Sequence, residues 1–311
     1  ILDRQDRINI NLFCSINNNN NKLVLCDIGG AGGLQPRWKF IEKKIKIIFF
    51  EPDHRSSIEL KKRGYQVIEK GLWSETARKK FYLTKKTQTS SMYKPNRSYL
   101  DLFPNASRFD IVNTVDIDVE PVDDFIYKLD QPHFIKLDVQ GAELEILKGS
   151  KQILKNVLGL EVEVNFKDMY ENIPLAHDIE KFLINEGFFL NDYLNFIRWE
   201  RDLHRSFGEI THGDALFLKT PEKIFEISQD LANPLSLFEN YIKILFIYNK
   251  LDLIKKLSEK ISDEYNQLLN LNLIISSLEK KHKRLFFVNK LVNYYTRHLV
   301  SKNNLFNHWN I

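Results

Sequence analysis

Short apolar runs typical of buried strands recur through residues 22–219 and alternate with helix-like stretches. These runs cover residues 23–26, 45–50, 66–68, 134–137, 157–164 and 215–218. Between them, residues 52–63, 142–154 and 176–186 have helical composition, and the last two stretches are amphipathic. Because parallel strands need long crossover connections that are usually helical, the alternation predicts an α/β fold with a doubly wound, mainly parallel sheet.

The chain is expected to contain three parts. Residues 1–21 are polar and end in a run of Asn, so we expect a flexible N-terminal segment. Residues 22–219 carry the alternation of strands and helices and form the main domain. Within it, residues 71–119 break the pattern: residues 81–83 predict a short strand, and residues 87–91 predict a polar loop. We expect this insertion to lie over the edge of the sheet where such folds bind ligands.

The third part, residues 220–311, has apolar residues at helical spacing over 235–257, 265–278 and 285–299, which predicts a helical C-terminal domain. This part carries the whole formal net charge of +4. A surplus this small argues against nucleic-acid binding. We interpret Lys280-Lys281-His282-Lys283-Arg284 as a solvated turn, with peripheral contact to an anionic surface as the alternative. The sequence leaves open whether this domain forms a homo-oligomer.

Cysteine content and hydropathy predict a cytoplasmic location. Cys14 and Cys26 are the only cysteines, too few for a disulfide framework or a zinc cluster, and they indicate a reducing compartment. No stretch approaches the roughly 18–20 uninterrupted apolar residues of a membrane span. The first residues also lack the basic-then-apolar order of a signal peptide.

A glycine-rich turn follows the first apolar run and reads Asp27-Ile28-Gly29-Gly30-Ala31-Gly32-Gly33. Such a turn allows the backbone to approach a ligand or a neighbouring strand closely. It does not match the G-x-G-x-x-G of dinucleotide-binding domains, but it matches D-x-G-x-x-x-G. An acid here suits the amino group and sulfonium of S-adenosylmethionine. Asp27, Gly29, Gly30 and Gly33 are therefore cofactor-binding candidates, with a purely structural turn as the alternative.

The next two strand ends add further candidates for a nucleoside site. Glu51 ends the second run, where an acid can accept hydrogen bonds from both ribose hydroxyls. Asp53 is interpreted as the N-cap of the following helix instead. Leu72 and Trp73 follow the third run and suit an adenine slot, with core packing of Trp73 as an equal alternative.

Residues 134–149 give the most specific local signal, a strand, a tight turn and a helix. The strand places Asp138 at its carboxyl end, where α/β proteins hold ligands and reactive groups. Gly141 permits the turn, and Glu143 lies in the first helical turn, where the helix dipole favours negative charge. Asp138 is therefore a candidate for cofactor binding and for catalysis.

Glu161, Glu163 and Asn165 alternate with apolar residues in the fifth long run, so their side chains share one face of the strand. A central parallel strand is normally apolar on both faces, and the polar stripe therefore indicates a ligand or a hydrogen-bond network. Pairing of Glu161 and Glu163 with Lys or Arg from the helices is the alternative.

Six blocks of the sequence resemble, in order, the FkbM family of S-adenosylmethionine-dependent methyltransferases. They are Asp27-Ile28-Gly29-Gly30, Phe50-Glu51-Pro52-Asp53, Thr89-Ser90-Ser91-Met92-Tyr93, Val122-Asp123-Asp124-Phe125, Lys136-Leu137-Asp138-Val139-Gln140-Gly141-Ala142-Glu143 and Glu161-Val162-Glu163. The resemblance covers residues 22–219 and excludes the helical C-terminal domain. It departs from the family's commoner motifs at Gln140, usually Glu, and in the glycine-rich loop, usually Gly-Ala-Asn, which indicates a subgroup.

The resemblance implies a Rossmann-like class I methyltransferase with a seven-stranded, mostly parallel sheet and helices on both faces. It also implies S-adenosyl-L-methionine as cofactor and O-methylation of hydroxyl groups on sugars, glycans or small metabolites. A carboxylate or imidazole can take the hydroxyl proton during such a transfer. The catalytic candidates are Glu163 and Asp138 first, then His212. The substrate-binding candidates are Ser90, Ser91, Glu161 and Tyr170.

No metal site is expected, because the other histidines lack partners at metal-ligand spacing and Asp138 lacks companion ligands. Two other functions stay open at this point. One is an NAD-dependent oxidoreductase on a Rossmann-like sheet, which the failed G-x-G-x-x-G match disfavours. The other is a non-catalytic methyltransferase-like scaffold that acts through its helical tail.

Overall fold

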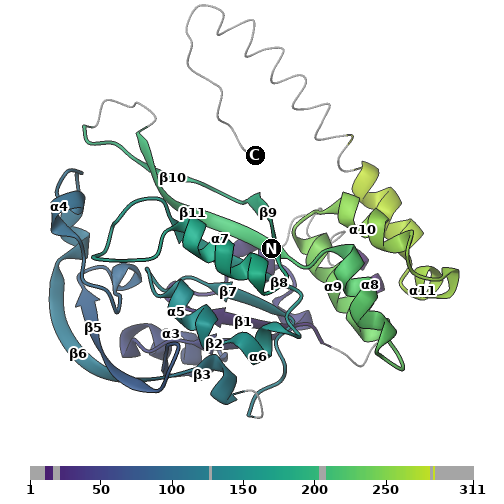
Figure 1. Ribbon diagram of the computed structural model, residues 1–311, viewed down its shortest axis with the longest axis horizontal. Coiled ribbons are helices and arrows are strands. Elements are labelled where there is room, and N and C mark those ends of the chain that lie inside the picture. The colour runs from purple at the N-terminus through teal and green to yellow at the C-terminus, as the bar shows by residue number, and fades with distance from the viewer. Residues whose placement is uncertain (1–10, 17–21, 126–127, 203–207, 281–282, 284–311) are drawn as a thin grey trace, which may run out of the picture. The chain divides into compact units, whose positions relative to one another are not determined.

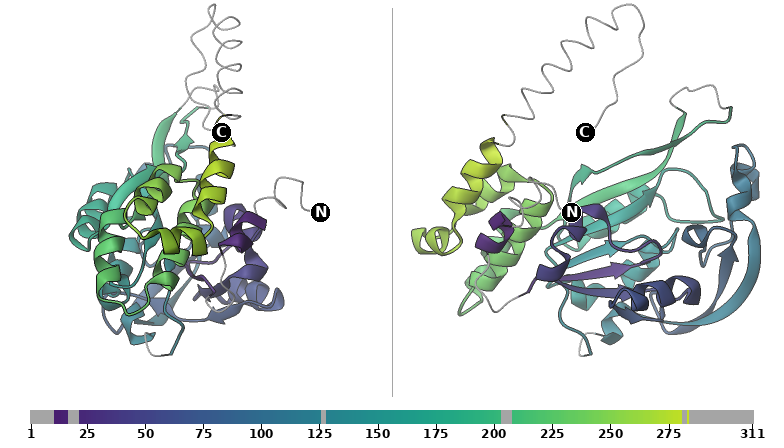
Figure 2. Two further views of the ribbon diagram at one scale, coloured as in Figure 1. Left: turned by 90° about the vertical axis from the view of Figure 1, so that its right-hand side faces the viewer. Right: turned by 180° about the vertical axis from the view of Figure 1, so that it is seen from behind.

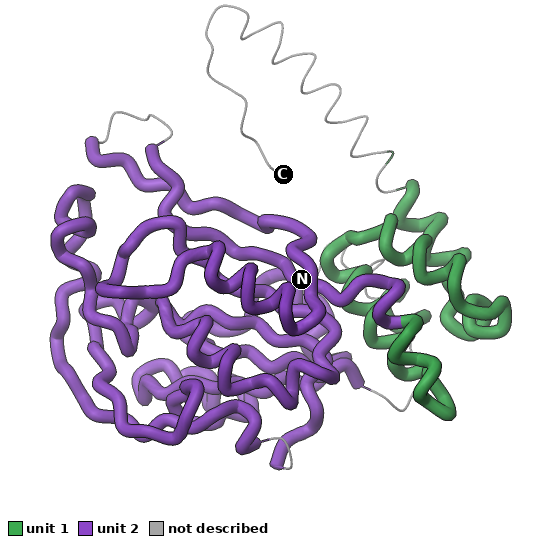
Figure 3. The backbone as a smooth tube through the Cα atoms, viewed as in Figure 1, with its two compact units in different colours: residues 1–18, 225–311 green, residues 19–224 purple. Residues whose placement is uncertain are grey.

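The computed structural model describes residues 11–16, 22–125, 128–202, 208–280 and 283, and the chain divides into two compact units (Figure 3). The larger unit comprises residues 19–224 and contains the sheets. The smaller unit comprises residues 1–18 and 225–311 and is helical where it is described. The domain boundaries expected from the sequence stay a proposal.

Eight strands of the described chain form the central sheet of the larger unit (Figure 1). They are β1 (Val24–Ile28), β2 (Lys46–Phe50), β3 (Gln66–Ile68), β7 (Phe134–Leu137), β8 (Gly159–Asn165), β9 (Phe189–Tyr193), β10 (Ile197–Trp199) and β11 (Glu209–Leu218). The order is β10-β11-β8-β7-β1-β2-β3, and β9 also pairs with β11. The pairs from β3 to β8 are parallel, whereas β11 runs antiparallel to β8, β9 and β10.

The sheet is seven strand positions wide, because β9 and β10 pair one after the other with β11. Phe189 lies opposite Leu218, and Trp199 lies opposite Glu209. β9 and β10 therefore occupy the same edge position of the sheet, and the chain leaves that position between Tyr193 and Ile197. The expected seven-stranded, mostly parallel sheet of a Rossmann-like fold is confirmed.

Helices cover both faces of this sheet. One face is covered by α5 (Glu143–Lys148), α6 (Lys151–Leu154) and α7 (Ala176–Asn185), which lie in front of the strands in Figure 1. The helices α2 (Pro36–Lys39) and α3 (His54–Lys62) lie on the face seen from behind in Figure 2, with the short η1 (Glu42–Lys44) between them in the chain. The helix expected over residues 142–154 is divided in two, at Gly149 and Ser150.

The core lies between the strands and the front helices. Ile146, Leu147 and Ile153 from α5 and α6 pack with strand residues such as Ile135 and Val162, and all five are at most 1% exposed. Burial of each such side chain contributes about 1.5–3 kcal/mol. This packing fixes the carboxyl ends of β7 and β8, which carry Asp138 and Glu163.

The insertion forms a second sheet of β4 (Gly71–Leu72), β5 (Ala77–Thr84) and β6 (Ile111–Glu120), in the order β4-β6-β5. Short helical segments accompany it: η2 (Thr87–Thr89), α4 (Arg97–Leu100), η3 (Ala106–Phe109) and η4 (Val122–Phe125). The sequence indicated a strand only at residues 81–83, so β6 and most of β5 were not predicted.

The smaller unit contains α9 (Leu235–Ile247), α10 (Leu251–Ser258) and α11 (Asp263–Leu268), and residues 271–280 are also helical. The boundary between the two units falls within α8 (Pro221–Gln229). Two of the expected helices are interrupted where Asn249 and Asn270 adopt positive φ angles of 59° and 53°. Residues 11–15 are helical with Phe13 buried, in place of the flexible segment expected there. The helix expected at 285–299 lies outside the described residues, as do Lys281, His282 and Arg284.

No helix in the described part of the chain combines the length and the apolar character needed to cross a membrane.

Candidate functional site

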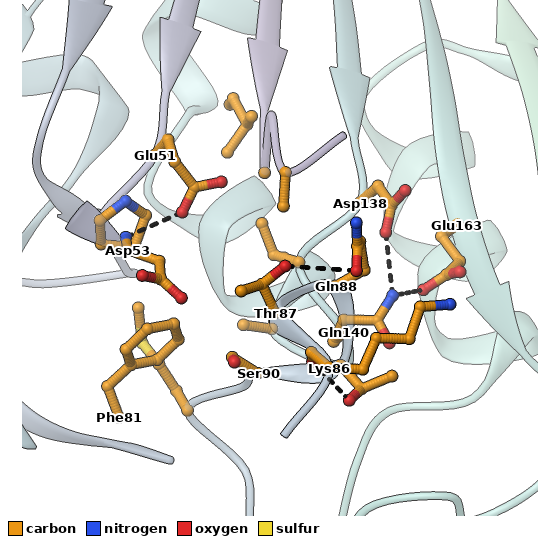
Figure 4. Close-up of a pocket in the computed structure, with 18 of the residues that line it drawn as sticks. Glu51, Asp53, Phe81, Lys86, Thr87, Gln88, Ser90, Asp138, Gln140 and Glu163 are labelled. Carbon is orange, nitrogen blue, oxygen red and sulfur yellow. Dashed lines mark hydrogen bonds between the residues drawn. The ribbon is translucent and has the colours of Figure 1, made fainter. Parts of the chain in front are cut away.

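A cavity of about 350 Å³ opens at the carboxyl ends of the parallel strands. This volume is in the range of small-molecule and cofactor sites. Figure 4 shows Glu51 and Asp53 on one side of the cavity, Asp138 and Glu163 on the other, and residues 86–90 of the insertion between them. The cavity therefore lies where a doubly wound sheet holds its ligands.

Gly29 forms part of the cavity wall and requires glycine for two reasons. Its φ is +86°, and a Cβ built on it would lie 1.8 Å from the carbonyl oxygen of Asp138. Gly30 and Gly33 do not line the cavity; a Cβ there would approach the Phe49 ring at 2.5 Å or the Arg63 guanidinium at 2.6 Å. The turn therefore brings the end of β1 directly against the end of β7.

Glu51 lies in the cavity wall with 3% of its surface exposed. Its Oε1 accepts a hydrogen bond of 2.8 Å from the backbone N–H of Asp53. Burial raises the pKa of Glu51 to about 7. Asp53 caps α3 by accepting a 2.9 Å bond from the N–H of Arg55, which confirms the predicted N-cap.

Leu72 lines the cavity, whereas Trp73 does not. The Trp73 ring lies 5.8 Å from that of Tyr93, and the Lys79 ammonium lies 4.8 Å from the Trp73 ring centroid. Of the two residues expected at the adenine slot, only Leu72 lies in the cavity wall. Trp73 packs against the core instead, which was the alternative interpretation.

A buried lysine, Lys136, lies between two of the candidate carboxylates. Its Nζ is 3.3 Å from Oδ2 of Asp138 and 3.7 Å from Oδ1 of Asp27. Burial acts to raise the pKa of Asp138, but Lys136 and a hydrogen bond from Gln140 outweigh it and hold this pKa below its usual range. Asp27 does not line the cavity, and its burial raises its pKa to about 6.

Glu161 belongs to the same buried row and does not line the cavity. In the sheet register, Asp27 lies opposite Lys136 and Lys136 lies opposite Glu161, so the three side chains share one face. Nε of Arg37 in α2 lies 3.7 Å from Oε2 of Glu161. Glu161 therefore has the ion pair with a helix residue that the alternative interpretation expected.

Gln140 joins the two catalytic candidates. Its side-chain amide donates hydrogen bonds to Oδ1 of Asp138 at 3.0 Å and to Oε2 of Glu163 at 2.7 Å (Figure 4). The Tyr170 hydroxyl donates to Oε1 of Gln140 at 2.9 Å, and the Ser91 hydroxyl donates to its carbonyl oxygen at 2.6 Å. Ser91 and Tyr170, expected to bind substrate, do not line the cavity and instead orient Gln140.

The turn that carries Gln140 is held by Glu143, which is 1% exposed. Its carboxylate accepts the backbone N–H groups of Val139 and Gly141, each at 2.9 Å. Glu143 thus stabilises the turn before α5 in addition to lying at the start of that helix.

The carboxyl groups of Asp138 and Glu163 differ in acidity. Burial, and next the charge of Asp138, hold the pKa of Glu163 well above its usual range. His212 also lines the cavity, with Nε2 3.8 Å from Oε1 of Glu163, and burial lowers its pKa to about 4. At neutral pH, Asp138 is therefore ionised, His212 is neutral, and Glu163 is the more basic carboxyl of the pair.

The remaining wall comes from the insertion and from β10. Ser90 lines the cavity, as expected of a substrate-side residue, and its Oγ accepts the N–H of Thr84 at 3.1 Å. Arg108, Phe109 and Trp199 also line it and were not predicted, because their segments carry no motif. Lys136 and Gln140 lie within the fifth of the six blocks, and period-two alternation places the Lys136 side chain on the same strand face as Asp138. The sequence therefore contained the signal that could have identified them.

Within the described residues, no group of three or more His, Cys, Asp or Glu side chains is placed to hold a metal ion.

A model of the FkbM methyltransferase domain matches residues 27–190, just over half of the chain. The chain belongs to the FkbM methyltransferase family. It is therefore an S-adenosylmethionine-dependent methyltransferase, and the oxidoreductase alternative is set aside. The cavity wall has features that suit this cofactor: Glu51 presents a buried carboxylate, Leu72 an apolar surface, and Gly29 a close backbone approach.

Solved structures also resemble this FkbM-family chain at low identity. Magnesium protoporphyrin IX methyltransferase (ChlM) from Synechocystis PCC 6803, with bound SAM, is 10% identical over 70% of this chain and 80% of its own, with a TM-score of 0.36. Precorrin-6y C5,15-methyltransferase from Geobacter metallireducens GS-15 is 14% identical over 71% and 90%, also with a TM-score of 0.36. No curated protein sequence matches the chain.

Proposed function

We propose that this FkbM-family protein transfers a methyl group from S-adenosylmethionine to a hydroxyl oxygen of a sugar, a glycan or a small metabolite. The proposal rests on one observation, the Asp138–Gln140–Glu163 arrangement in the cavity wall beside Gly29. A hydroxyl oxygen must lose its proton as it attacks carbon, and a carboxylate with a raised pKa is suited to take that proton near neutral pH.

Each residue of the cavity has a proposed task. Glu51 accepts hydrogen bonds from the ribose hydroxyls, and Leu72 covers the adenine. The cofactor, when bound, supplies a methyl group on a positively charged sulfur. Glu163 takes the proton of the acceptor hydroxyl, and Gln140 fixes its orientation. Lys136 keeps Asp138 ionised, and the charge of Asp138 in turn keeps Glu163 basic.

The test of this proposal combines binding with product analysis. Calorimetry should detect binding of S-adenosylhomocysteine to the wild-type protein. Untargeted mass spectrometry of a strain that lacks the protein should reveal a glycan or metabolite lighter by one methylene. If a Glu163→Gln variant that binds S-adenosylhomocysteine fully complements that strain, the result supports the non-catalytic scaffold instead. If the methyl group is found on nitrogen or carbon, O-methylation is refuted.

Cofactor binding is expected to weaken as the pH falls through 7. The pKa of Glu51 is about 7, and its ionised form is the better acceptor for two hydroxyl groups. Protonation of Glu51 removes one charge-assisted hydrogen bond, which is worth about 1.5–3 kcal/mol. The affinity at a pH well below the pKa of Glu51 should therefore be roughly 10-fold or more lower than the affinity at a pH above it. Calorimetry with S-adenosylhomocysteine between about pH 5.5 and pH 8.5 measures this profile.

A Glu51→Gln variant provides the control, because an amide does not ionise. Its affinity should stay near the low-pH value of the wild type across the range. The same slope in both proteins would assign the pH dependence to another group, such as Asp27, whose pKa is about 6.

A further inference from the structure

The cations of the cavity wall are not all balanced by carboxylates of the chain. Lys70, Lys86 and Arg108 line the cavity in the described part of the chain. Lys70 forms a 2.6 Å ion pair with Glu120. For Lys86 and Arg108, no carboxylate of a described residue lies within ion-pair distance. Lys86 is exposed, whereas Arg108 is half-buried. An unbalanced cation in a half-buried position such as that of Arg108 is costly unless a ligand supplies the opposite charge.

Two aromatic rings hold the Arg108 guanidinium in the wall. Its central carbon lies 4.5 Å from the centroid of the Trp199 ring and 5.2 Å from that of Phe109. Both rings also line the cavity. Rings that pack on the faces of a guanidinium fix its plane and leave its N–H edge for hydrogen bonds.

That N–H edge has no acceptor among the described residues. The Nε atom is buried without a hydrogen-bond partner, and the rest of the guanidinium donates no hydrogen bond to any described residue. An arginine remains charged under all ordinary conditions, so the group cannot relieve this state by losing a proton. An oxyanion that presents two oxygen atoms to accept two parallel hydrogen bonds, as a carboxylate or a phosphate does, fits such an edge.

Lys86 is held beside Arg108 by the backbone. Its N–H donates a 3.1 Å hydrogen bond to the carbonyl oxygen of Arg108, and the hydroxyl of Thr89 donates to the same oxygen at 3.1 Å. Residues 86–90, which lie in the cavity wall in Figure 4, are thus hydrogen-bonded to the segment that carries Arg108. Lys86 and Arg108 therefore lie on neighbouring segments, and both contribute positive charge to the cavity wall.

This positive region adjoins the proposed catalytic group. The His212 ring lies 5.9 Å from the Trp199 ring, and Nε2 of His212 lies 3.8 Å from Oε1 of Glu163. Arg108, Trp199, His212 and Glu163 thus follow one another along the wall as a chain of neighbours. An acceptor whose hydroxyl lies at Glu163 would extend along Trp199 toward Arg108.

We propose that the methyl acceptor carries an anionic oxyacid group, a carboxylate or a phosphate, which Arg108 binds through its N–H edge with Lys86 beside it. This inference rests on the proposed function and adds the chemical class of its substrate. The aromatic surface of Trp199 and Phe109 fits a ring, of a sugar or an aromatic compound, between the hydroxyl and the anion.

The test uses ring-containing probes in place of the unidentified acceptor. The full chain, with and without saturating S-adenosylhomocysteine, is titrated at low ionic strength with phenyl phosphate, benzoate and the neutral benzyl alcohol. The wild type should bind an anionic probe at least about 10-fold more tightly than the neutral one, a difference of about 1.4 kcal/mol. The tighter of the two anions identifies the oxyacid.

Arg108→Met retains an unbranched apolar stem and removes the charge, so it should lose that 10-fold preference, whereas Arg108→Lys should retain part of it. Arg201→Met is the matched control: Arg201 lies 6.0 Å from the Phe103 ring, pairs with Glu209, and does not line the cavity. It should bind the probes as the wild type does.

Equal affinity of wild type and Arg108→Met for both anions, or no anion binding by the wild type, overturns the inference. A fall in S-adenosylhomocysteine affinity in Arg108→Met without a change in anion binding also overturns it, since Arg108 would then bind the cofactor carboxylate. Failure of the wild type to bind S-adenosylhomocysteine would refute the proposed function instead, and the titration without it would still report on Arg108.

Discussion

A Glu163→Gln variant should transfer methyl groups about 10²–10⁴-fold more slowly than the wild type while binding S-adenosylhomocysteine with unchanged affinity. The amide has nearly the shape of the carboxylate and can still pair with Gln140, but it cannot accept a proton at neutral pH. Because Glu163 and Glu51 lie on opposite sides of the cavity, the cofactor contacts should remain intact (Figure 4). Single-turnover rates and calorimetry measure the two effects separately.

Glu209→Gln is the matched control for this experiment. Glu209 lies in the adjacent strand β11, pairs with Lys167 and Arg201, and does not line the cavity. The same chemical change there should alter the rate by less than about twofold, as expected of a surface ion pair. A similar loss of rate in both variants, or an unchanged rate in Glu163→Gln, would contradict the proposed base.

The pH dependence of the rate tests the role of Asp138. A base acts in its ionised form, so the rate should rise as the pH passes the pKa of Glu163. The charge of Asp138 is one cause of that raised pKa. Asp138→Asn should therefore move the rise to lower pH, whereas a purely structural role for Asp138 would lower the rate without moving the midpoint.

The sheet was largely predictable from the sequence because its strands are buried on both faces. Runs such as residues 45–50 and 134–137 are apolar apart from one lysine each, Lys46 and Lys136, and they correspond to β2 and β7. The strand β6 was missed because it is mostly exposed and alternates Val115, Ile117 and Val119 with Asp and Glu. That alternation is itself a strand signal, and it was overlooked within the insertion.

The candidate site was predictable only where a side chain follows a recognisable strand. Glu51, Asp138 and Glu163 each lie at a strand's carboxyl end, and the structure places all three in one cavity wall. Period-two alternation showed that Glu161 and Glu163 share a face, but it did not show which of them reaches the cavity. Strand length and the position of the cavity decide this: Glu163 lies two residues closer to the carboxyl edge.

Arg108 and Trp199 show what local patterns leave out. One comes from the insertion and the other from the interrupted edge strand, and they meet only through tertiary packing. No spacing rule links positions so far apart in the chain. Likewise, the positive φ angles of Asn249 and Asn270 end helices within stretches whose apolar spacing continues, because periodicity reports burial and not backbone conformation.

Gly29→Ala should damage the protein more than an alanine at any open glycine of the same loop. The left-handed conformation at φ +86° costs a residue with a Cβ about 1–2 kcal/mol. In addition, the new Cβ would lie 1.8 Å from the carbonyl oxygen of Asp138, so backbone must move. Overpacking of this kind costs about 1–3 kcal/mol more. We expect a loss of about 2–5 kcal/mol in the free energy of unfolding.

Gly32→Ala separates the clash from the backbone strain. Gly32 has a φ of +104° in the same loop, but a Cβ there meets no atom within 4 Å. It should therefore show the conformational cost alone, about 1–2 kcal/mol, and bind S-adenosylhomocysteine nearly as the wild type does. Gly29→Ala should also lose cofactor affinity, since the displaced backbone carries Asp138 and belongs to the cavity wall. Equal stability and equal affinity of the two variants, measured by chemical unfolding and calorimetry, would show that the close contact between β1 and β7 does not form the cofactor site.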